Sequence, residues 1–450
     1  MINGIFRFKI LLVAIAGLML FGITAHSATK DFNPIVFTKD SLPNGLVVIY
    51  QVDKSAPVVS TIMHYRVGSK DENPNLTGFA HFFEHLMFES TDKIARGELE
   101  KLIQSAGGNF NAHTSFDETV YYINLPSDQL PLALWIEAQR LSKLNVDTVG
   151  VETQRGVIQE ERKQRTENQP YGSMLDKMMQ NLFKGGSYSW TPIGSEEHIG
   201  TATISQFRAF YDNFYQPCNA TLVISGDFEI ETAKKYIDSY FAVIPTAPLP
   251  KRESFKMPPL NGEYTEEIED VLASLPGLFI GYRAPSLKDS LYYAANLLAS
   301  ILSSGESSRL YRKIVDEEQE AVAVDFQIIP LEKSGIFLIV GIPGPNKSIS
   351  KVKTLLDKEI EKLTTEGISD EELNKAKSIF EANFVSSKKS ASSKAREIAS
   401  FQSYYNEPSL INSELDKFMD VSKEDILQAA KLYLSTNNRV VLTYKPATKN

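Results

Sequence analysis

The sequence predicts an α+β protein built from two tandem, related domains. At 450 residues the chain is too long for one compact core, so two or more domains are expected. Strand-like and helix-like apolar patterns occur in both halves. Residues 279–302 repeat the strand–turn–helix order of residues 62–88, and both segments carry Tyr-Arg at the end of the strand. This internal match is weak, but it points to a duplicated unit.

A proline-rich stretch separates the two halves. Five prolines fall within residues 242–264, and such clusters interrupt helices and strands. We therefore expect an amino-terminal domain at 28–244, a linker at 245–262 and a carboxy-terminal domain at 263–450. The linker is too short for large separation, so the halves should pack together.

Residues 1–27 have the pattern of a signal peptide. Arg7 and Lys9 precede an apolar run of 14 residues, 10–23, which is short for a membrane span. Ala25 and Ser27 supply the small residues of a cleavage site. We expect export of the chain, with a retained amino-terminal anchor as the alternative.

Charge and cysteine content narrow the function classes. The formal net charge of −9 argues against nucleic acid as a partner and against binding to anionic membranes by charge. Cys218 is the only cysteine, so no internal disulfide is possible. We expect Cys218 to be a small buried apolar residue rather than a nucleophile.

The stretch 77–88, TGFAHFFEHLMF, carries the strongest functional signal. On a helix, at about 100° per residue, His81, Glu84 and His85 share one face. Phe79, Phe82, Phe83 and Leu86 fall on the opposite face and predict contact with a core. Thr77 is a plausible N-cap for this helix.

Two histidines one turn apart can both direct a ring nitrogen at one metal ion. Zinc with three protein ligands keeps one position open for water, and Glu84 can take a proton from that water. The alternative is that His81, Glu84 and His85 only decorate a helix surface.

The order His-x-x-Glu-His resembles the inverted zinc motif of the pitrilysin/insulinase family, which includes insulysin and the mitochondrial processing peptidase. Several further stretches resemble family segments, and the resemblance spans nearly all of residues 34–446. They include VGSKDENP at 67–74, GGNFNAHTS at 107–115, PIGSEEHI at 192–199 and SSRL at 307–310. The family implies two tandem α+β domains, each a mainly antiparallel sheet with helices on one face, and only the first domain active.

The resemblance also implies a third metal ligand. The family places a Glu about 76 residues after the second His, in a Glu-Arg-x-Val-x-x-x-Glu pattern. QRGVIQEE, 154–161, is similar, and Glu161 lies 76 residues after His85. Glu160 points about 100° away on the helix, so Glu161 is the preferred ligand. A solvated acidic helix face is the alternative interpretation.

Two departures from the family pattern affect the predicted site. Gln154 stands where most active members carry a Glu behind the metal ligands, which predicts weaker zinc binding or lower activity. In many active members an Arg and a Tyr of the inactive half bind the substrate. The second half of this chain keeps the Arg as Arg309, but it has Glu-Ala-Val-Ala, 320–323, where the family carries the Tyr. Asn111 and Ala112 would line the scissile bond on an edge strand that pairs with the peptide.

The expected function is a zinc-dependent endopeptidase that cleaves peptides or unfolded segments in extended form, with Glu84 as the base. We expect it in the periplasm of a Gram-negative bacterium or secreted, with no membrane contact after signal removal. The missing Tyr favours a chamber shared with a related second subunit, or a homodimer. The alternative is a catalytically weak or idle subunit with a structural or binding role.

Overall fold

The computed structural model describes residues 33–252, 255 and 257–447. The predicted signal peptide at 1–27 lies outside the described residues. All helices and strands of the described part belong to one compact unit that begins at Ile35. In this part, no helix is long and apolar enough to cross a membrane.

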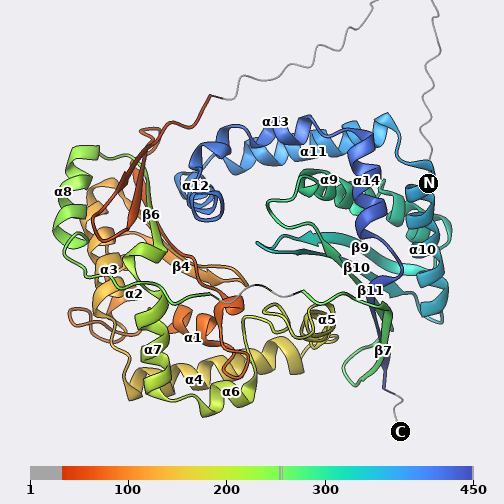
Figure 1. Cartoon of the computed structure of the whole chain (residues 1–450), viewed down its shortest axis with the longest axis horizontal. Helices are drawn as coiled ribbons and strands as arrows, with labels where there is room; N and C mark the ends of the chain where they lie inside the picture. Colours follow the sequence, from red (N-terminus) through yellow and green to blue (C-terminus); the bar gives the residue numbers. More distant parts are fainter. Residues whose placement is uncertain (1–32, 253–254, 256, 448–450) are drawn as a thin grey trace, which may run out of the picture. The chain divides into compact units, whose positions relative to one another are not determined.

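The first half forms a six-stranded sheet with the strand order β1-β2-β6-β3-β5-β4 (Figure 1). Its pairs are antiparallel except for β2 with β6. The strands are β1 Thr38–Ser41, β2 Val47–Val52, β3 Val58–Tyr65, β4 Asn109–Thr114, β5 Thr119–Pro126 and β6 Ala220–Gly226. The helices are α1 Phe79–Leu86, α2 Glu98–Ser105, α3 Leu130–Lys143, α4 Thr148–Arg162, α5 Met174–Leu182, α6 Glu196–Thr201, α7 Ile204–Phe214 and α8 Ile230–Tyr240.

The second half forms a five-stranded sheet with the order β7-β11-β8-β10-β9. Here too one pair, β7 with β11, is parallel. The strands are β7 Gly262–Asp270, β8 Gly277–Ala284, β9 Ala321–Ile329, β10 Gly335–Pro343 and β11 Asn438–Pro446. The helices are α9 Tyr292–Ser303, α10 Ile349–Glu366, α11 Asp370–Ser387, α12 Ala391–Tyr405, α13 Glu414–Met419 and α14 Lys423–Tyr433.

The two halves match element by element. Strands β2, β6, β3, β5 and β4 correspond in order to β7, β11, β8, β10 and β9. Helices α3 to α7 fall between β5 and β6, as α10 to α14 fall between β10 and β11. The predicted fold class, two tandem α+β domains with mainly antiparallel sheets, is confirmed. The exact domain boundaries stay a prediction.

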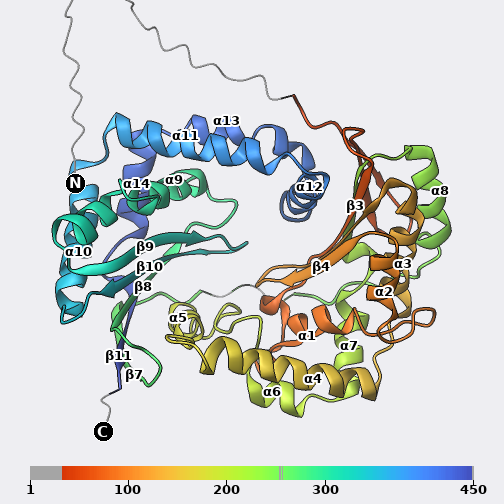
Figure 2. The same cartoon turned by 180° about the vertical axis from the view of Figure 1, so that it is seen from behind.

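Each half also covers the other half's sheet with one helix. Helix α12 packs on β3 and β6, whereas α5 packs on β8 and β11 (Figure 1 and Figure 2). Met178 and Leu182 of α5 lie in one apolar cluster with Phe279 of β8. The remaining face of β8 packs against its own half's helices through Leu278, Ile280 and Tyr282. This exchange explains why every residue of β6 and β8 is buried.

Polar contacts tie the halves together beside these helices. Glu118 binds His64 at 2.7 Å within the first half and accepts a 2.6 Å hydrogen bond from Tyr404 of α12. Asp117 accepts a 2.8 Å bond from the backbone N–H of Glu332 in the second half. Buried polar groups that are paired in this way fix one arrangement of the two halves.

Cys218 is exposed, so its predicted burial is wrong. It lies in a short 3-10 turn, Pro217–Asn219, directly before β6. Its thiol is 3.5 Å from the carbonyl oxygen of Ala247. The apolar strand that follows suggested burial, but the burial begins only after the turn.

Candidate active site

Helix α1 is held in place by its aromatic face. Phe79 stacks on Phe207 of α7 with ring centroids 4.6 Å apart, and Phe83 stacks on Phe210 at 5.5 Å. These phenylalanines are buried. Their packing aims the opposite face, with His81 and His85, away from the core of the first half.

The start of α1 is capped by a carboxylate from the segment that precedes the helix. Gly78 occupies the N-cap position with φ of 95°, a left-handed conformation that favours glycine. Glu72 accepts hydrogen bonds from the N–H groups of Gly78 at 2.9 Å and Ala80 at 2.8 Å. Burial raises the pKa of Glu72 to about 8, against the opposing effect of these N–H groups.

Thr77 does not cap α1, so that prediction is wrong. Helix α1 begins at Phe79, so Gly78 and not Thr77 occupies the N-cap position. The Thr77 hydroxyl lies 2.9 Å from His198 Nδ1 and accepts a bond from the N–H of Ser195. It therefore ties the segment just before α1 to α6 and to the N-cap of α6.

Helices α1 and α4 bring three potential metal ligands together. Glu161 Oε2 lies 3.3 Å from His85 Nε2 and 3.6 Å from His81 Nε2. One ligand atom from each residue lies within 4.8 Å of the others. Among the described residues, this is the only group of three or more His, Cys, Asp or Glu side chains with this geometry.

The state of these side chains fits a divalent cation. Glu161 Oε2 is buried without a hydrogen-bond partner among the described residues, while Oε1 pairs with Arg165 at 2.6 Å. Burial lowers the pKa of His81 to about 4, with Glu161 opposing the shift. A neutral imidazole is the form that binds metal. Two His nitrogens and one carboxylate form a donor set used by catalytic zinc.

Glu160 lies on a different face of α4. It is exposed and accepts a 3.2 Å hydrogen bond from Gln164. Glu160 therefore does not join His81 and His85, which supports the preference for Glu161. The assignment of Glu161 as a zinc ligand stays a prediction.

Glu84 has a free carboxylate. It lies on α1 one turn after His81 and is half-buried, and its carboxylate makes no hydrogen bond or ion pair with any other described residue. A carboxylate with no internal partner is available as a proton acceptor.

Gln154 stands directly behind His85. Its Oε1 lies 3.2 Å from His85 Nδ1, and its amide nitrogen donates to the carboxylate of Glu89. Glu89 is buried and also pairs with Arg96. Sequence reasoning missed Glu89. The available signal was its place four residues after His85, just beyond the end of α1.

The predicted substrate residues lie on the edge strand β4. Strand β4 pairs with β5 on one side only and is the last strand of the sheet. It packs beside α1, where Phe110 and Phe88 have ring centroids 5.1 Å apart. Asn111 is exposed and Ala112 is half-buried on this strand. The role of Asn111 and Ala112 in substrate binding stays a prediction.

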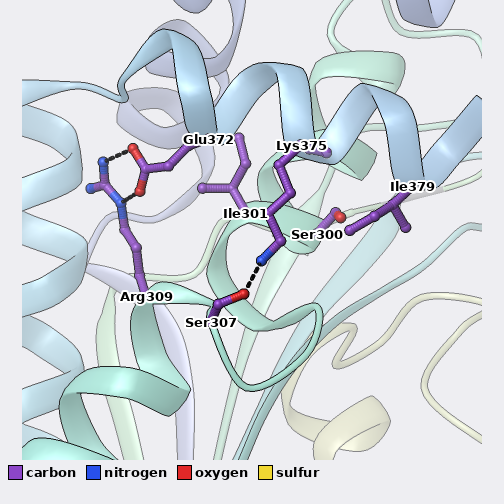
Figure 3. A pocket seen from close by; sticks show the side chains of 8 residues that line it. Ser300, Ile301, Ser307, Arg309, Glu372, Lys375 and Ile379 are labelled. Atoms are coloured by element: carbon purple, nitrogen blue, oxygen red, sulfur yellow. Dashed lines mark hydrogen bonds and ion pairs between the residues drawn. The ribbon is translucent and has the colours of Figure 1, made fainter. Parts of the chain in front are cut away.

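Arg309 has an internal partner. Its guanidinium pairs with the Glu372 carboxylate (Figure 3). It also donates a 2.9 Å bond to the carbonyl of Gly367. Its side chain is 15% exposed. A role for Arg309 in substrate binding stays a prediction, and it would require this pair to open.

Two family models match the chain. Residues 47–193 match the model described as insulinase, peptidase family M16, and residues 201–380 match the M16 inactive domain. The chain belongs to the M16 peptidase family. The first match contains the His81–Glu161 cluster, and the second covers most of the half without such a cluster among its described residues.

Known M16 proteins resemble the chain over nearly its whole length. The zinc protease PqqE of Helicobacter pylori is 29% identical over 412 residues, covering 90% of this chain and 92% of that protein. An uncharacterised zinc protease of Streptomyces coelicolor is 24% identical, covering 87% of this chain and 86% of that protein.

Solved structures give the same result for the fold. The crystal structure of a protease from Helicobacter pylori has a TM-score of 0.87 and 28% identity, and covers 91% of this chain and 100% of that one. The periplasmic protease PqqL from Escherichia coli has a TM-score of 0.74 at 20% identity. The match covers 91% of this chain and 48% of PqqL, so this chain has the size of about half of that protein.

Proposed function

We propose that this M16 protein is a zinc-dependent endopeptidase that cleaves peptides or unfolded segments in extended conformation. The observation that carries the proposal is the His81–His85–Glu161 cluster beside the unpaired carboxylate of Glu84. The zinc proteases among its relatives support the choice of metal.

In this proposal His81, His85 and Glu161 hold the ion. When bound, zinc supplies a Lewis acid that lowers the pKa of a water molecule to near 7. Glu84 takes a proton from the attacking water and later returns it to the leaving amine. Gln154 keeps the ring of His85 oriented by accepting from its Nδ1–H.

Strand β4 positions the substrate. Its outer edge carries backbone groups with no strand partner among the described residues. A peptide added there forms main-chain hydrogen bonds that do not depend on its sequence. Asn111 and Ala112 would then lie opposite the scissile bond.

The signal-like sequence at 1–27 favours work outside the cytoplasm, in the periplasm or secreted. The second half offers Arg309 only in an ion pair and has no Tyr at 320–323. We therefore propose that a related second subunit, or a second copy of the chain, completes the substrate site.

A cleavage assay tests the function. The mature chain is loaded with zinc, and cleavage of a quenched fluorescent peptide is followed before and after a chelator. We expect cleavage that the chelator removes and added zinc restores. Glu161→Gln should lower the zinc content, whereas the matched variant Glu160→Gln should not. Chelator-insensitive cleavage would overturn the zinc mechanism, and exchanged behaviour of the two variants would overturn the ligand assignment.

A subunit that binds peptide without cleaving it is the second candidate. The observation in its favour is Gln154, which places an uncharged amide behind His85. This candidate predicts full zinc content and peptide binding, but no turnover with any tested partner.

A further inference from the structure

A cavity of about 490 Å³ lies at the end of the β4–β5 hairpin. The hairpin lines it through Ser115, Asp117 and Glu118. Helices α11, α12 and α13 supply most of the other walls. This volume is in the range of sites that hold small ligands or several side-chain groups.

The walls are largely aromatic. Phe380, Phe384, Phe401, Tyr293 and Tyr405 contribute rings. Three lysines already lie over these rings, with Nζ-to-centroid distances of 4.3, 5.7 and 5.7 Å: Lys388 over Phe384, Lys288 over Tyr405 and Lys417 over Tyr293. Ring faces attract cations, and they also pack well against an aliphatic stem.

The charged groups lining the cavity are mostly acidic. Four carboxylates line it, those of Asp117, Glu118, Glu397 and Glu414, and Lys70 pairs with Asp117 at 3.2 Å from outside the lining. Lys388 is buried and pairs with Glu397. Three of these carboxylates therefore have close basic partners, and Glu414 is the one left to attract a further cation.

Glu414 is the carboxylate with room for a ligand. Glu118 is bound by His64 and Tyr404. The Glu414 carboxylate makes no hydrogen bond with a described residue, and its only ion-pair contact is Lys388 at 3.9 Å. Burial raises the pKa of Glu414. A buried carboxylate without a close partner is stabilised more by a new neighbouring cation than a carboxylate that is already paired.

The cavity lies at one end of the proposed substrate strand. Ser115 follows Ala112 by three positions, which is roughly 10 Å at about 3.3 Å per strand residue. A peptide paired with β4 and cleaved opposite Ala112 would therefore reach the cavity with a residue about three to six positions from the scissile bond.

We infer that this cavity is a specificity pocket for a basic side chain, arginine or lysine, of the bound peptide. The stem packs on the aromatic walls and the charged head binds Glu414. The inference rests on the proposed function for the path of the peptide along β4. It adds a preference for a basic residue in the substrate, and the second half of the molecule supplies most of the residues that recognise it.

The test uses binding, which does not require turnover. A zinc-loaded Glu84→Gln variant of the full chain is titrated with fluorescent, otherwise uncharged peptides that carry one arginine. The arginine is moved through the positions on both sides of the scissile bond, which is mapped with the wild type. We expect about tenfold tighter binding at one or two adjacent positions, equal to about 1.4 kcal/mol.

Variants assign the preference to the pocket. Glu414→Gln should remove the tenfold difference, while Glu414→Asp and the exposed control Glu424→Gln should keep it. Thermal melts check that each variant is folded. An equal affinity for all peptides, or a preference that survives Glu414→Gln, overturns the pocket.

The same experiment separates the two proposals. Suppose that the wild type cleaves no peptide, but one position of the arginine gives tighter binding than the others. The pocket then stands and the peptidase proposal falls. If cleavage occurs and the arginine makes no difference, the peptidase proposal stands and the pocket falls. Absence of binding by every peptide overturns the pocket and the substrate path together.

Discussion

At the scale of single residues, the link from His85 through Gln154 to Glu89 explains how this M16 protein can carry Gln154. The His85 ring donates to the Gln154 carbonyl oxygen, and the Gln154 amide donates to Glu89. An amide can receive one hydrogen bond and give another, which a carboxylate cannot do. The negative charge therefore lies one hydrogen bond further from the ring, on a buried glutamate.

This link predicts an unusual pattern of zinc affinities. Glu89→Gln should weaken zinc binding by about 10- to 100-fold, the usual effect of losing a partner behind a metal ligand. Gln154→Glu should bring no gain, because two carboxylates would then face each other at hydrogen-bond distance. The double variant Gln154→Glu with Glu89→Gln should recover the affinity, since one carboxylate again stands next to an amide.

Competition with a chelating dye measures these affinities, and Glu160→Gln serves as the exposed control. Tighter zinc binding by Gln154→Glu alone would contradict the proposed arrangement.

Glu84 allows a second prediction at this scale. Glu84→Gln should retain zinc, because Glu84 is not in the ligand cluster, and should lower kcat by about 10²–10⁴-fold. Metal analysis and peptide cleavage on the same preparation check both parts. Near-normal cleavage would remove Glu84 from the role of base.

The residues that sequence could indicate are those set by local spacing. His81, Glu84 and His85 share a helix face because of the helical period, and the family pattern added Glu161. Glu72 and Glu89 were not found, because their roles depend on contacts made in the folded chain. Glu72 reaches α1 from outside the helix, and Glu89 meets a side chain 65 residues away.

At the scale of elements, the ion pair of Arg309 and Glu372 secures the start of α11. Glu372 belongs to a capping box with Ser369 and also receives the Arg309 guanidinium. Burial opposes ionisation, but Arg309 and the N–H of Ser369 outweigh it and lower the pKa of Glu372 to about 2. A carboxylate with a depressed pKa stabilises the fold above its unfolded pKa, and this stabilisation is lost as the pH falls.

This sign gives a prediction for Glu372→Gln. The variant should be less stable than the wild type at pH 6 to 7. The difference should shrink as the pH falls from about 4.5 towards 2, because the wild type then loses the same interaction. Urea denaturation at several pH values measures it, with the exposed neighbour Glu371→Gln as control. A difference that does not change with pH would contradict the role of the charge.

Sequence patterns located several elements closely and missed others. The sequence predicts helices at 98–105 and at 370–387, and the structure has α2 and α11 with these bounds. Both have clear ends, at Gly107-Gly108 for α2 and at the Ser369 cap for α11. The exchanged helices α5 and α12 were not predicted. Each is defined by the sheet of the other half, and nothing local in 174–182 or 391–405 reveals that surface.

At the scale of the whole molecule, the paired Arg309 and the absent Tyr predict that the chain alone is a poor peptidase. Residues 201–380, which include much of the second half, match the model described as the M16 inactive domain. We expect the isolated mature chain to cleave peptides slowly and a related subunit to raise the rate. Light scattering measures the mass of the mixture, and the peptide assay measures its rate. Full activity of the isolated chain, unchanged by the added subunit, would contradict the two-subunit arrangement.

The exchange of α5 and α12 also bears on how such a chain could arise and be divided. A solitary half would leave one face of its sheet bare, so residues 35–244 and 245–450 expressed separately should aggregate or stay unfolded. Produced in the same cell, they should associate and restore the native melting transition. Independent folding of either fragment would contradict this. If the fragments do depend on each other, the simplest ancestor is a symmetric pair of short chains, each of which covered the other's sheet with one helix, and gene fusion then joined the two chains.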